Sequence, residues 1–161
     1  MSNILHPPSS NFTRTAHLNK IQYDEMYSQS IREPEKFWSE QGDRLDWIKR
    51  FTKVKNVSYS HPNVSIKWYE DGILNVSANC IDRHLATRGK QTAIIWEGDN
   101  PSDEKHISYI ELHEKVSRLA NVYKSLGIGK GDRVVLYMPM IPEAAYAMLA
   151  CARIGAVHSI V

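Results

Sequence analysis

The chain has 161 residues, of which 42% are hydrophobic and 24% charged, with a formal net charge of +2. This length allows one domain with a sizeable core, and the composition is ordinary for a soluble globular protein. So small a net charge argues against a nucleic-acid or anionic-membrane partner. The most basic stretch, residues 49–55, is interpreted as a solvated face.

The N-terminus and the cysteines bear on the cellular compartment. No apolar run is long enough to cross a membrane, and residues 1–20 lack the apolar stretch of a signal peptide. The cysteines, Cys80 and Cys151, are far apart and lack metal-ligand spacing. We therefore expect a cytoplasmic protein in which both cysteines are buried free thiols.

The first ninety residues are predicted to form an arm and a layer. Residues 1–20 are polar and lack helical or strand periodicity, which favours a flexible arm. Two short helices are expected between residues 23 and 45, with Pro34 in the first turn of the second. Residues 46–74 carry aromatic side chains at irregular spacing, which favours an extended layer wrapped on a larger body. The alternative is a small, loop-rich domain.

The rest of the layer contains one predicted helix. Residues 70–72 form a turn, and Asn75 is a plausible N-cap of a helix that continues through Leu85. Gly89 lies where such a helix would end. Asp82 and Arg83, inside this helix, are interpreted as an anchoring ion pair or as surface charge.

From Gln91 onward the pattern changes to α/β. Residues 92–96 and 106–107 are predicted to pair as a hairpin. Ser108 and Glu111 have the spacing of a capping box, and apolar residues at intervals of three and four then predict an amphipathic helix that ends at Gly127.

The last thirty residues predict a β–α–β crossover. A buried-type strand at 133–137 is followed by a loop at 138–141, an apolar and therefore buried helix at 142–154, and another buried strand at 156–161. Such a crossover is right-handed and its strands are parallel. A parallel sheet needs more strands and helical cover on both faces, so we expect the chain to be a fragment.

These elements together define the expected fold. The class is α/β, with a helical and extended N-terminal layer followed by the start of a large α/β domain whose sheet is incomplete. The predicted divisions are residues 1–20, a flexible arm; residues 21–89, the layer; and residues 90–161, the beginning of the large domain.

Two loops have features that could indicate a phosphate site. The glycine-rich stretch 127–132 lies between a helix end and a strand start, whereas a phosphate cradle precedes the N-terminus of a helix. Its glycines are therefore interpreted as a helix stop and a turn. The loop at 138–141 does precede a helix, but Glu143 would repel an anion and Pro142 removes an N–H donor. This loop is interpreted as structural.

No other chemistry-bearing arrangement is evident. His84, His106, His113 and His158 share no metal-ligand spacing. His158 lies within a predicted strand, where a histidine on the core or on the sheet face is expected. The residues alone thus indicate an α/β fragment without an assignable catalytic site.

Six stretches share their sequence with one enzyme family. They are residues 65–72, 74–85, 92–98, 107–112, 137–144 and 150–159. Together they resemble the AMP-forming acetyl-CoA synthetases, which belong to the adenylate-forming acyl-CoA ligases. The resemblance covers nearly everything after residue 20.

The resemblance implies a reaction for the whole enzyme. Acetate attacks the α-phosphate of ATP, giving acetyl-adenylate and pyrophosphate while Mg²⁺ balances phosphate charge, and coenzyme A then displaces AMP to give acetyl-CoA. It also implies a large α/β domain and a small, mobile C-terminal domain. The implied partners are acetate, ATP, coenzyme A and the remainder of the same chain. The oligomeric state is left open.

The resemblance assigns no site residue within this chain. The family's ATP loop, acetate pocket, adenine motifs and catalytic lysine are expected beyond Val161. We therefore nominate no catalytic, cofactor-binding or metal-binding residue, and we expect this fragment alone to be inactive. The alternatives are an independently folding binding or assembly module, a propionyl-CoA synthetase relative, and a nucleotide-binding Rossmann protein, which the misplaced glycines disfavour.

Overall fold

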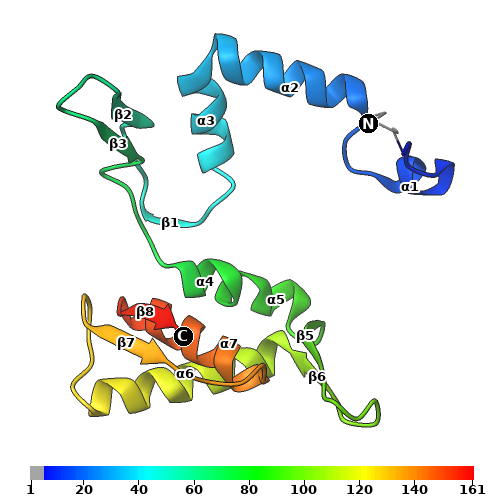
Figure 1. Cartoon of the computed structure of the whole chain (residues 1–161), viewed down its shortest axis with the longest axis vertical. Coiled ribbons are helices and arrows are strands. Elements are labelled where there is room, and N and C mark those ends of the chain that lie inside the picture. The colour runs from blue at the N-terminus through cyan, green and yellow to red at the C-terminus, as the bar shows by residue number, and fades with distance from the viewer. Residues whose placement is uncertain (1–5) are drawn as a thin grey trace. The chain divides into compact units, whose positions relative to one another are not determined.

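The computed structural model describes residues 6–161, which divide into two compact units (Figure 1). Of the described residues, 6–44 and 54–70 form unit 1, and 45–53 and 71–161 form unit 2. The chain thus passes from unit 1 into unit 2, returns to unit 1, and enters unit 2 again. The three predicted sequence divisions stay a prediction about domains. Compactness places residues 71–89 together with the α/β part.

Unit 1 combines helices with one hairpin. Its described elements are α1 (Ser10–Thr15), α2 (Lys20–Arg32), α3 (Pro34–Gly42), β2 (Lys55–Ser58) and β3 (Ser65–Trp68). The two helices predicted between residues 23 and 45 are confirmed as α2 and α3, and Pro34 occupies the first turn of α3. Strands β2 and β3 pair antiparallel, from Lys55 opposite Trp68 to Ser58 opposite Ser65.

Helix α1 was not expected from the polar sequence around it. It begins where the Ser9 side chain accepts a hydrogen bond from the Phe12 amide, an N-cap that needs no apolar periodicity. None of its residues is buried. Residues 1–5, the first part of the predicted arm, lie outside the described residues.

Aromatic side chains supply much of the packing in unit 1. Trp38 lies edge-on to both Phe37 and Trp68, with ring centroids 5.1 and 5.8 Å apart. The Tyr69 hydroxyl donates a 2.7 Å hydrogen bond to the Trp38 carbonyl oxygen. Burial, with a smaller effect of Asp43, raises the pKa of Tyr69. Irregularly spaced aromatics thus meet in space, while the wrapping of a larger body stays a prediction.

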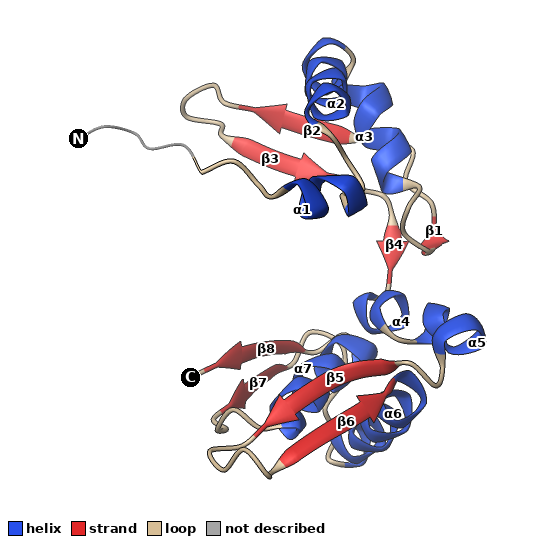
Figure 2. Cartoon of the chain, turned by 90° about the vertical axis from the view of Figure 1, so that its right-hand side faces the viewer, coloured by secondary structure: helices blue, strands red, loops and turns tan. Residues whose placement is uncertain are grey.

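Unit 2 carries the α/β pattern. Its elements are β1 (Trp47–Lys49), β4 (Ile73–Leu74), α4 (Val76–Cys80), the 3₁₀ turn η1 (Asp82–His84), α5 (Leu85–Arg88), β5 (Thr92–Glu97), β6 (Glu104–Ser108), α6 (Tyr109–Ser125), β7 (Arg133–Leu136), α7 (Pro142–Ile154) and β8 (Val157–Ile160). Strands β1 and β4 pair antiparallel, as do β5 and β6, whereas β7 and β8 are parallel. Figure 2 shows strands β5–β8 beside helices α6 and α7.

The predicted helix from Asn75 through Leu85 is wrong as a single helix. Asn75 does cap α4, accepting a hydrogen bond from the Ala78 amide, but α4 ends at Cys80. Ile81 leaves the helical region, with φ −123° and ψ −65°, and the chain continues through η1 and α5. The break lets Ile81 enter the core, where none of its surface is exposed. Tertiary burial has overridden local helix continuity.

The core of unit 2 is centred on helices α6 and α7. The capping box of Ser108 and Glu111 is confirmed, and the amphipathic face of α6 is buried as predicted. The core consists of Ile81, Ile107, Leu112, Val116, Ala120, Tyr146 and Ala150. Since a fully buried aliphatic side chain contributes about 1.5–3 kcal/mol, this cluster dominates the packing of the unit.

The C-terminal crossover follows the prediction. Strand β7, helix α7 and strand β8 form a β–α–β unit in which Arg133 lies opposite Val157 and Leu136 lies opposite Ile160. Gly155 ends α7 in the left-handed conformation, with φ +78°, which glycine adopts without strain. Burial differs from the prediction in both strands. Val135 in β7 is 66% exposed, and Val157 and Ile160 in β8 are 56% and 60% exposed. Across residues 6–161, no helix is both long and apolar enough to span a bilayer.

Candidate functional site

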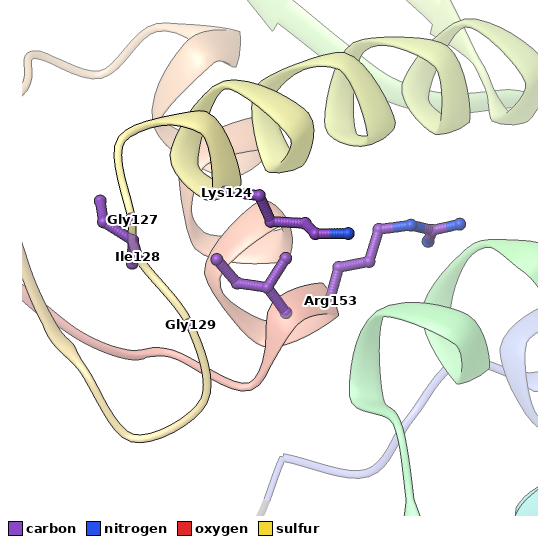
Figure 3. A pocket seen from close by; sticks show the side chains of 6 residues that line it. Lys124, Gly127, Ile128, Gly129 and Arg153 are labelled. Atoms are coloured by element: carbon purple, nitrogen blue, oxygen red, sulfur yellow. The ribbon is translucent and has the colours of Figure 1, made fainter.

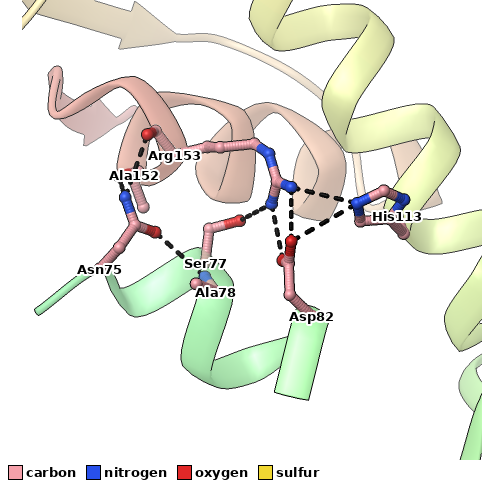
Figure 4. A network of polar contacts seen from close by, with 7 residues as sticks. All are labelled: Asn75, Ser77, Ala78, Asp82, His113, Ala152 and Arg153. Carbon is pink, nitrogen blue, oxygen red and sulfur yellow. Dashed lines mark hydrogen bonds and ion pairs between the residues drawn. The ribbon is translucent and has the colours of Figure 1, made fainter. Parts of the chain in front are cut away.

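The structure gathers polar side chains around one arginine, although the sequence nominated no site residue. Asn75, Ser77, Asp82, His113 and Arg153 come from the segment after β4 and from helices α6 and α7 (Figure 4). We call these five residues the Arg153 cluster. All lie within unit 2.

Two charged groups form the centre of the cluster. The Arg153 guanidinium donates to both carboxylate oxygens of Asp82, at 2.8 and 2.7 Å, in a bidentate pair. The hydrogen bond from Arg153 lowers the pKa of Asp82, and the same bond raises the pKa of Arg153. Both side chains are therefore charged at neutral pH. Asp82 thus forms an anchoring ion pair with Arg153 and not with its sequence neighbour Arg83.

The Arg153 guanidinium has two further polar contacts. Its Nη1 also lies 3.3 Å from the hydroxyl of Ser77, which has no exposed surface. Its Nη2 lies 3.1 Å from Nε2 of His113, which is itself 3.5 Å from Asp82. A neutral imidazole accepts such a bond from the guanidinium.

Asn75 joins two helix ends in this cluster. Its oxygen caps the N-terminus of α4, while its amide nitrogen donates to the carbonyl oxygens of Ala152 and Arg153, at 3.3 and 3.0 Å. Carbonyl groups in the last turn of a helix lack intrahelical partners. The Asn75 side chain therefore supplies hydrogen-bond partners to the N-terminus of α4 and to the C-terminus of α7. The cluster as a whole joins α4 and η1 to α6 and α7.

The cluster can hold the helices of unit 2 in position. It contains no activated nucleophile, and the Asp82 carboxylate and the Arg153 guanidinium are already committed to each other. Sequence reasoning found Asn75 and Asp82 but not Arg153 or His113. Arg153 is 71 positions from Asp82, and no local pattern marks such a pair. Arg83, the neighbour suggested by sequence, has its Nε 3.6 Å from Asp46 instead.

The glycine-rich stretch forms a turn, as predicted. Gly127 follows α6 with φ +84°, and the Gly129 amide donates to the side chain of Asp132 at 2.8 Å. A hollow of about 400 Å³ lies beside it (Figure 3), lined by Lys124, Gly127, Ile128, Gly129, Arg153 and Ile154. Lys124 and Arg153 bring positive charge to this hollow, and the Arg153 guanidinium is paired with Asp82. Helices α6 and α7 both end here, so the hollow faces helix C-termini and not the N-terminal N–H groups of a phosphate cradle.

The loop at 138–141 borders an apolar hollow. Its volume is about 270 Å³, and its lining is Leu136, Met138, Pro139, Met140, Ile141, Ala144, Ala145, Met148 and Ile160. The Trp96 indole N–H donates to the Met140 carbonyl oxygen at 2.7 Å, which fixes the loop. Glu143 lies in the first turn of α7, as the sequence indicated. Neither the lining nor this carboxylate suits an anionic ligand.

The four histidines weighed as metal ligands from the sequence are dispersed through unit 2. The ring of His84 is 5.2 Å from that of Tyr109, His106 lies 3.7 Å from Glu104, and His158 sits opposite Val134 in the sheet, as a sheet-face residue. Among residues 6–161, no three His, Cys, Asp or Glu side chains are grouped as metal ligands.

The cysteines divide between surface and core. Both are free, and Cys151 is buried in α7, where desolvation raises the pKa of its thiol. The expectation that Cys80 is also buried is wrong, because this residue is exposed. Helix α4 ends at Cys80, and the turn that follows directs Ile81 into the core instead.

Comparison with known families accounts for nearly the whole chain. Residues 23–80 match the family described as the acetyl-coenzyme A synthetase N-terminus, and residues 81–161 match the family described as AMP-binding enzyme. The two matches adjoin within the segment that connects α4 to η1. The Arg153 cluster joins residues from both matched regions, because Asn75 and Ser77 lie before this point and Asp82, His113 and Arg153 lie after it.

Relatives named acetyl-coenzyme A synthetase and one solved CoA synthetase structure are similar to this chain. The chain is 63% identical over its full length to an acetyl-coenzyme A synthetase of Methylocella silvestris and 60% identical to one of Beijerinckia indica, and it spans 25% of each. An acetoacetyl-CoA synthetase structure from Streptomyces lividans matches 94% of this chain and 23% of its own, with a TM-score of 0.74 and 25% identity. The chain therefore spans about a quarter of the relatives that it matches. It belongs to the AMP-binding enzyme family, with an acetyl-coenzyme A synthetase N-terminus in residues 23–80.

Proposed function

We propose that this chain is part of an acetate–CoA ligase that makes acetyl-CoA from acetate, ATP and coenzyme A. The observation that carries the proposal is the pair of adjoining family matches, which together cover residues 23–161. Relatives at 60% and 63% identity that bear the name acetyl-coenzyme A synthetase support it. The proposal includes a cytoplasmic location, where ATP and coenzyme A are available.

The proposed reaction proceeds in two displacements. A carboxylate oxygen of acetate attacks the α-phosphorus of ATP, and pyrophosphate leaves. The thiol sulfur of coenzyme A then attacks the carbonyl carbon of the acetyl-adenylate, and AMP leaves. Mg²⁺ would neutralise phosphate charge in the first step.

The described residues supply scaffold and not reaction chemistry in this proposal. In the glycine turn at 127–132, the Gly129 amide already donates to the Asp132 side chain. In the Arg153 cluster, the charges of Arg153 and Asp82 are paired with each other. We therefore assign no step of the reaction to this chain. Segment 6–161 is proposed to be inactive alone and to hold none of the three cofactors.

An exposed apolar sheet face supports the proposed role of scaffold. Val135 and Val157, which lie on the same face of the paired strands β7 and β8, are 66% and 56% exposed. Parallel strands are normally covered on both faces. We propose that the remainder of the same polypeptide covers them in the complete enzyme.

Two activity measurements test the proposal. The longer protein that contains this sequence is expected to release pyrophosphate from ATP only when acetate is present, and to form AMP and acetyl-CoA when coenzyme A is added. The purified 161-residue chain is expected to do neither. Acetate-independent turnover by the longer protein, or acetate-dependent turnover by the short chain, would contradict the proposal.

Acyl-chain choice needs a separate measurement. Acetate is proposed over propionate because the relatives at 60% identity or more carry the acetyl name, whereas the acetoacetyl-CoA synthetase is only 25% identical. Comparing kcat/KM for acetate, propionate and acetoacetate with the longer protein decides among them. A larger value for propionate would place the protein with the propionyl-CoA synthetases.

A further inference from the structure

One carboxylate joins the two chain segments at which the chain leaves and re-enters unit 2. Oδ1 of Asp71 accepts from the backbone amides of Thr52 and Lys53, at 3.0 and 3.1 Å. Its Oδ2 accepts from the Thr52 amide at 3.0 Å and from the Thr52 hydroxyl at 2.7 Å. We call these three residues the Asp71 clasp.

The clasp lies where the chain passes between unit 2 and unit 1. Unit 2 is interrupted after Lys53 and resumes at Asp71, and residues 54–70 between them belong to unit 1. The clasp therefore closes the base of this excursion. Just beyond it, the Tyr69 amide donates to the Val54 carbonyl oxygen at 2.9 Å, and the pairing of β2 with β3 then begins at Lys55 and Trp68.

Packing below the clasp holds Asp71 in place. Gly72 lies so close to Trp47 that an added Cβ would be 2.6 Å from its Cζ3 and 3.2 Å from the Cβ of Phe51. Phe51 is only 2% exposed, and its ring meets that of Trp47 edge-on. Because a side chain at position 72 would not fit, the backbone beside Asp71 is tightly seated. The carboxylate is thus presented to Thr52 and Lys53 with little conformational freedom to lose.

We propose that the Asp71 clasp is a hinge lock that holds together the two connecting segments at the base of residues 54–70. With the clasp closed, the segments move as one pair. With the carboxylate or the Thr52 hydroxyl removed, each segment moves separately and opens locally.

Limited proteolysis of the full chain tests the lock, because Lys53 is a trypsin site inside it. Asp71→Ala is expected to speed cleavage after Lys53 by about tenfold, and Thr52→Val by a smaller factor, through more frequent local opening. The matched controls are Asp99→Ala, at an exposed aspartate in the turn between β5 and β6, and Thr52→Ser, which keeps the hydroxyl. Both controls are expected to match the parent chain.

Amide hydrogen exchange separates local opening from misfolding. In Asp71→Ala and Thr52→Val, faster exchange at Thr52 and Lys53 with unchanged exchange at Val116, in the core of unit 2, supports the lock. Cleavage and exchange at parental rates in both variants would overturn it. Equal acceleration at Thr52 and Val116 in Thr52→Val would also overturn it, because the clasp would then stabilise the whole unit and not the hinge.

Discussion

The two units hold their helices by different means. Helix α6 of unit 2 buries Leu112, Val116 and Ala120 against partners in its own unit. Helix α2 of unit 1 has no buried residue, and its residues Tyr27 and Ile31 are 58% and 65% exposed. Yet both helices begin with a capping box. Caps and local pattern can therefore specify a helix, but only a packed partner anchors it.

The sharpest test of this comparison removes one isoleucine from each unit. Ile81→Ala is expected to lower the free energy of unfolding of unit 2 by about 2–5 kcal/mol, because its side chain is fully buried. Ile31→Ala, on the exposed face of α2, is expected to change stability by no more than about 0.5 kcal/mol. Native-state amide exchange reads each unit separately. Equal losses would show that α2 is anchored as firmly as the core.

Next in size is the loss of the arginine that fastens α7 to the segment after β4. Arg153→Ala is expected to destabilise unit 2 by about 1–3 kcal/mol, because it leaves the partly buried Asp82 without its bidentate partner. Arg118→Ala, an exposed arginine on α6, serves as the control. Urea denaturation measures both. If the double variant Arg153→Ala, Asp82→Ala lost as much as the two single variants combined, the pair would not be coupled.

A smaller effect is expected from the two capping boxes. Ser108→Ala is expected to cost about 1 kcal/mol and to destabilise unit 2 as a whole, since α6 forms part of its core. Asn19→Ala removes an equivalent cap, but its effect should stay within α2, seen as faster amide exchange there alone. Spread of the Asn19 effect into α3 would show that α2 is coupled to the rest of unit 1.

The smallest expected effect is a pH dependence at the Asp71 clasp. The Thr52 hydroxyl, followed by the amides of Thr52 and Lys53, holds the pKa of Asp71 far below its ordinary range. In the unfolded chain this group takes up its proton near pH 3.9, as aspartate usually does. Its stabilising contribution is therefore complete above that pH and is lost as the pH falls toward the folded-state pKa.

The variant Asp71→Asn isolates this contribution from other carboxyl groups. Asp82 and Glu111 also have lowered pKa values, through hydrogen bonds from Arg153 and from the Ser108 backbone, so they act in the same direction. Urea midpoints at several pH values below 5 should rise less steeply with pH in Asp71→Asn than in the parent chain. Identical slopes would mean that Asp71 does not contribute.

Local chemistry determined most of the helices and strands. Helix starts and ends depend on hydrogen bonds and backbone angles of neighbouring residues, so they can be predicted from adjacent positions. Examples are Pro34 in the first turn of α3, the capping box of Ser108 and Glu111, and Gly127 after α6. The parallel crossover at 133–161 was predictable for a related reason, since a short helix between two apolar strands has few ways to return. The family resemblance rested on longer continuous stretches and was confirmed by comparison.

Tertiary structure alone decided where the helix after Asn75 is interrupted and which groups the charged side chains contact. Ile81 interrupts a locally plausible helix because burying its side chain stabilises the fold more than helix continuity does. Arg153 and Asp82, like Asp71 and Thr52, are joined across long stretches of sequence by contacts that no local periodicity encodes. Such pairs depend on which surfaces meet after folding, and sequence spacing carries no record of that geometry.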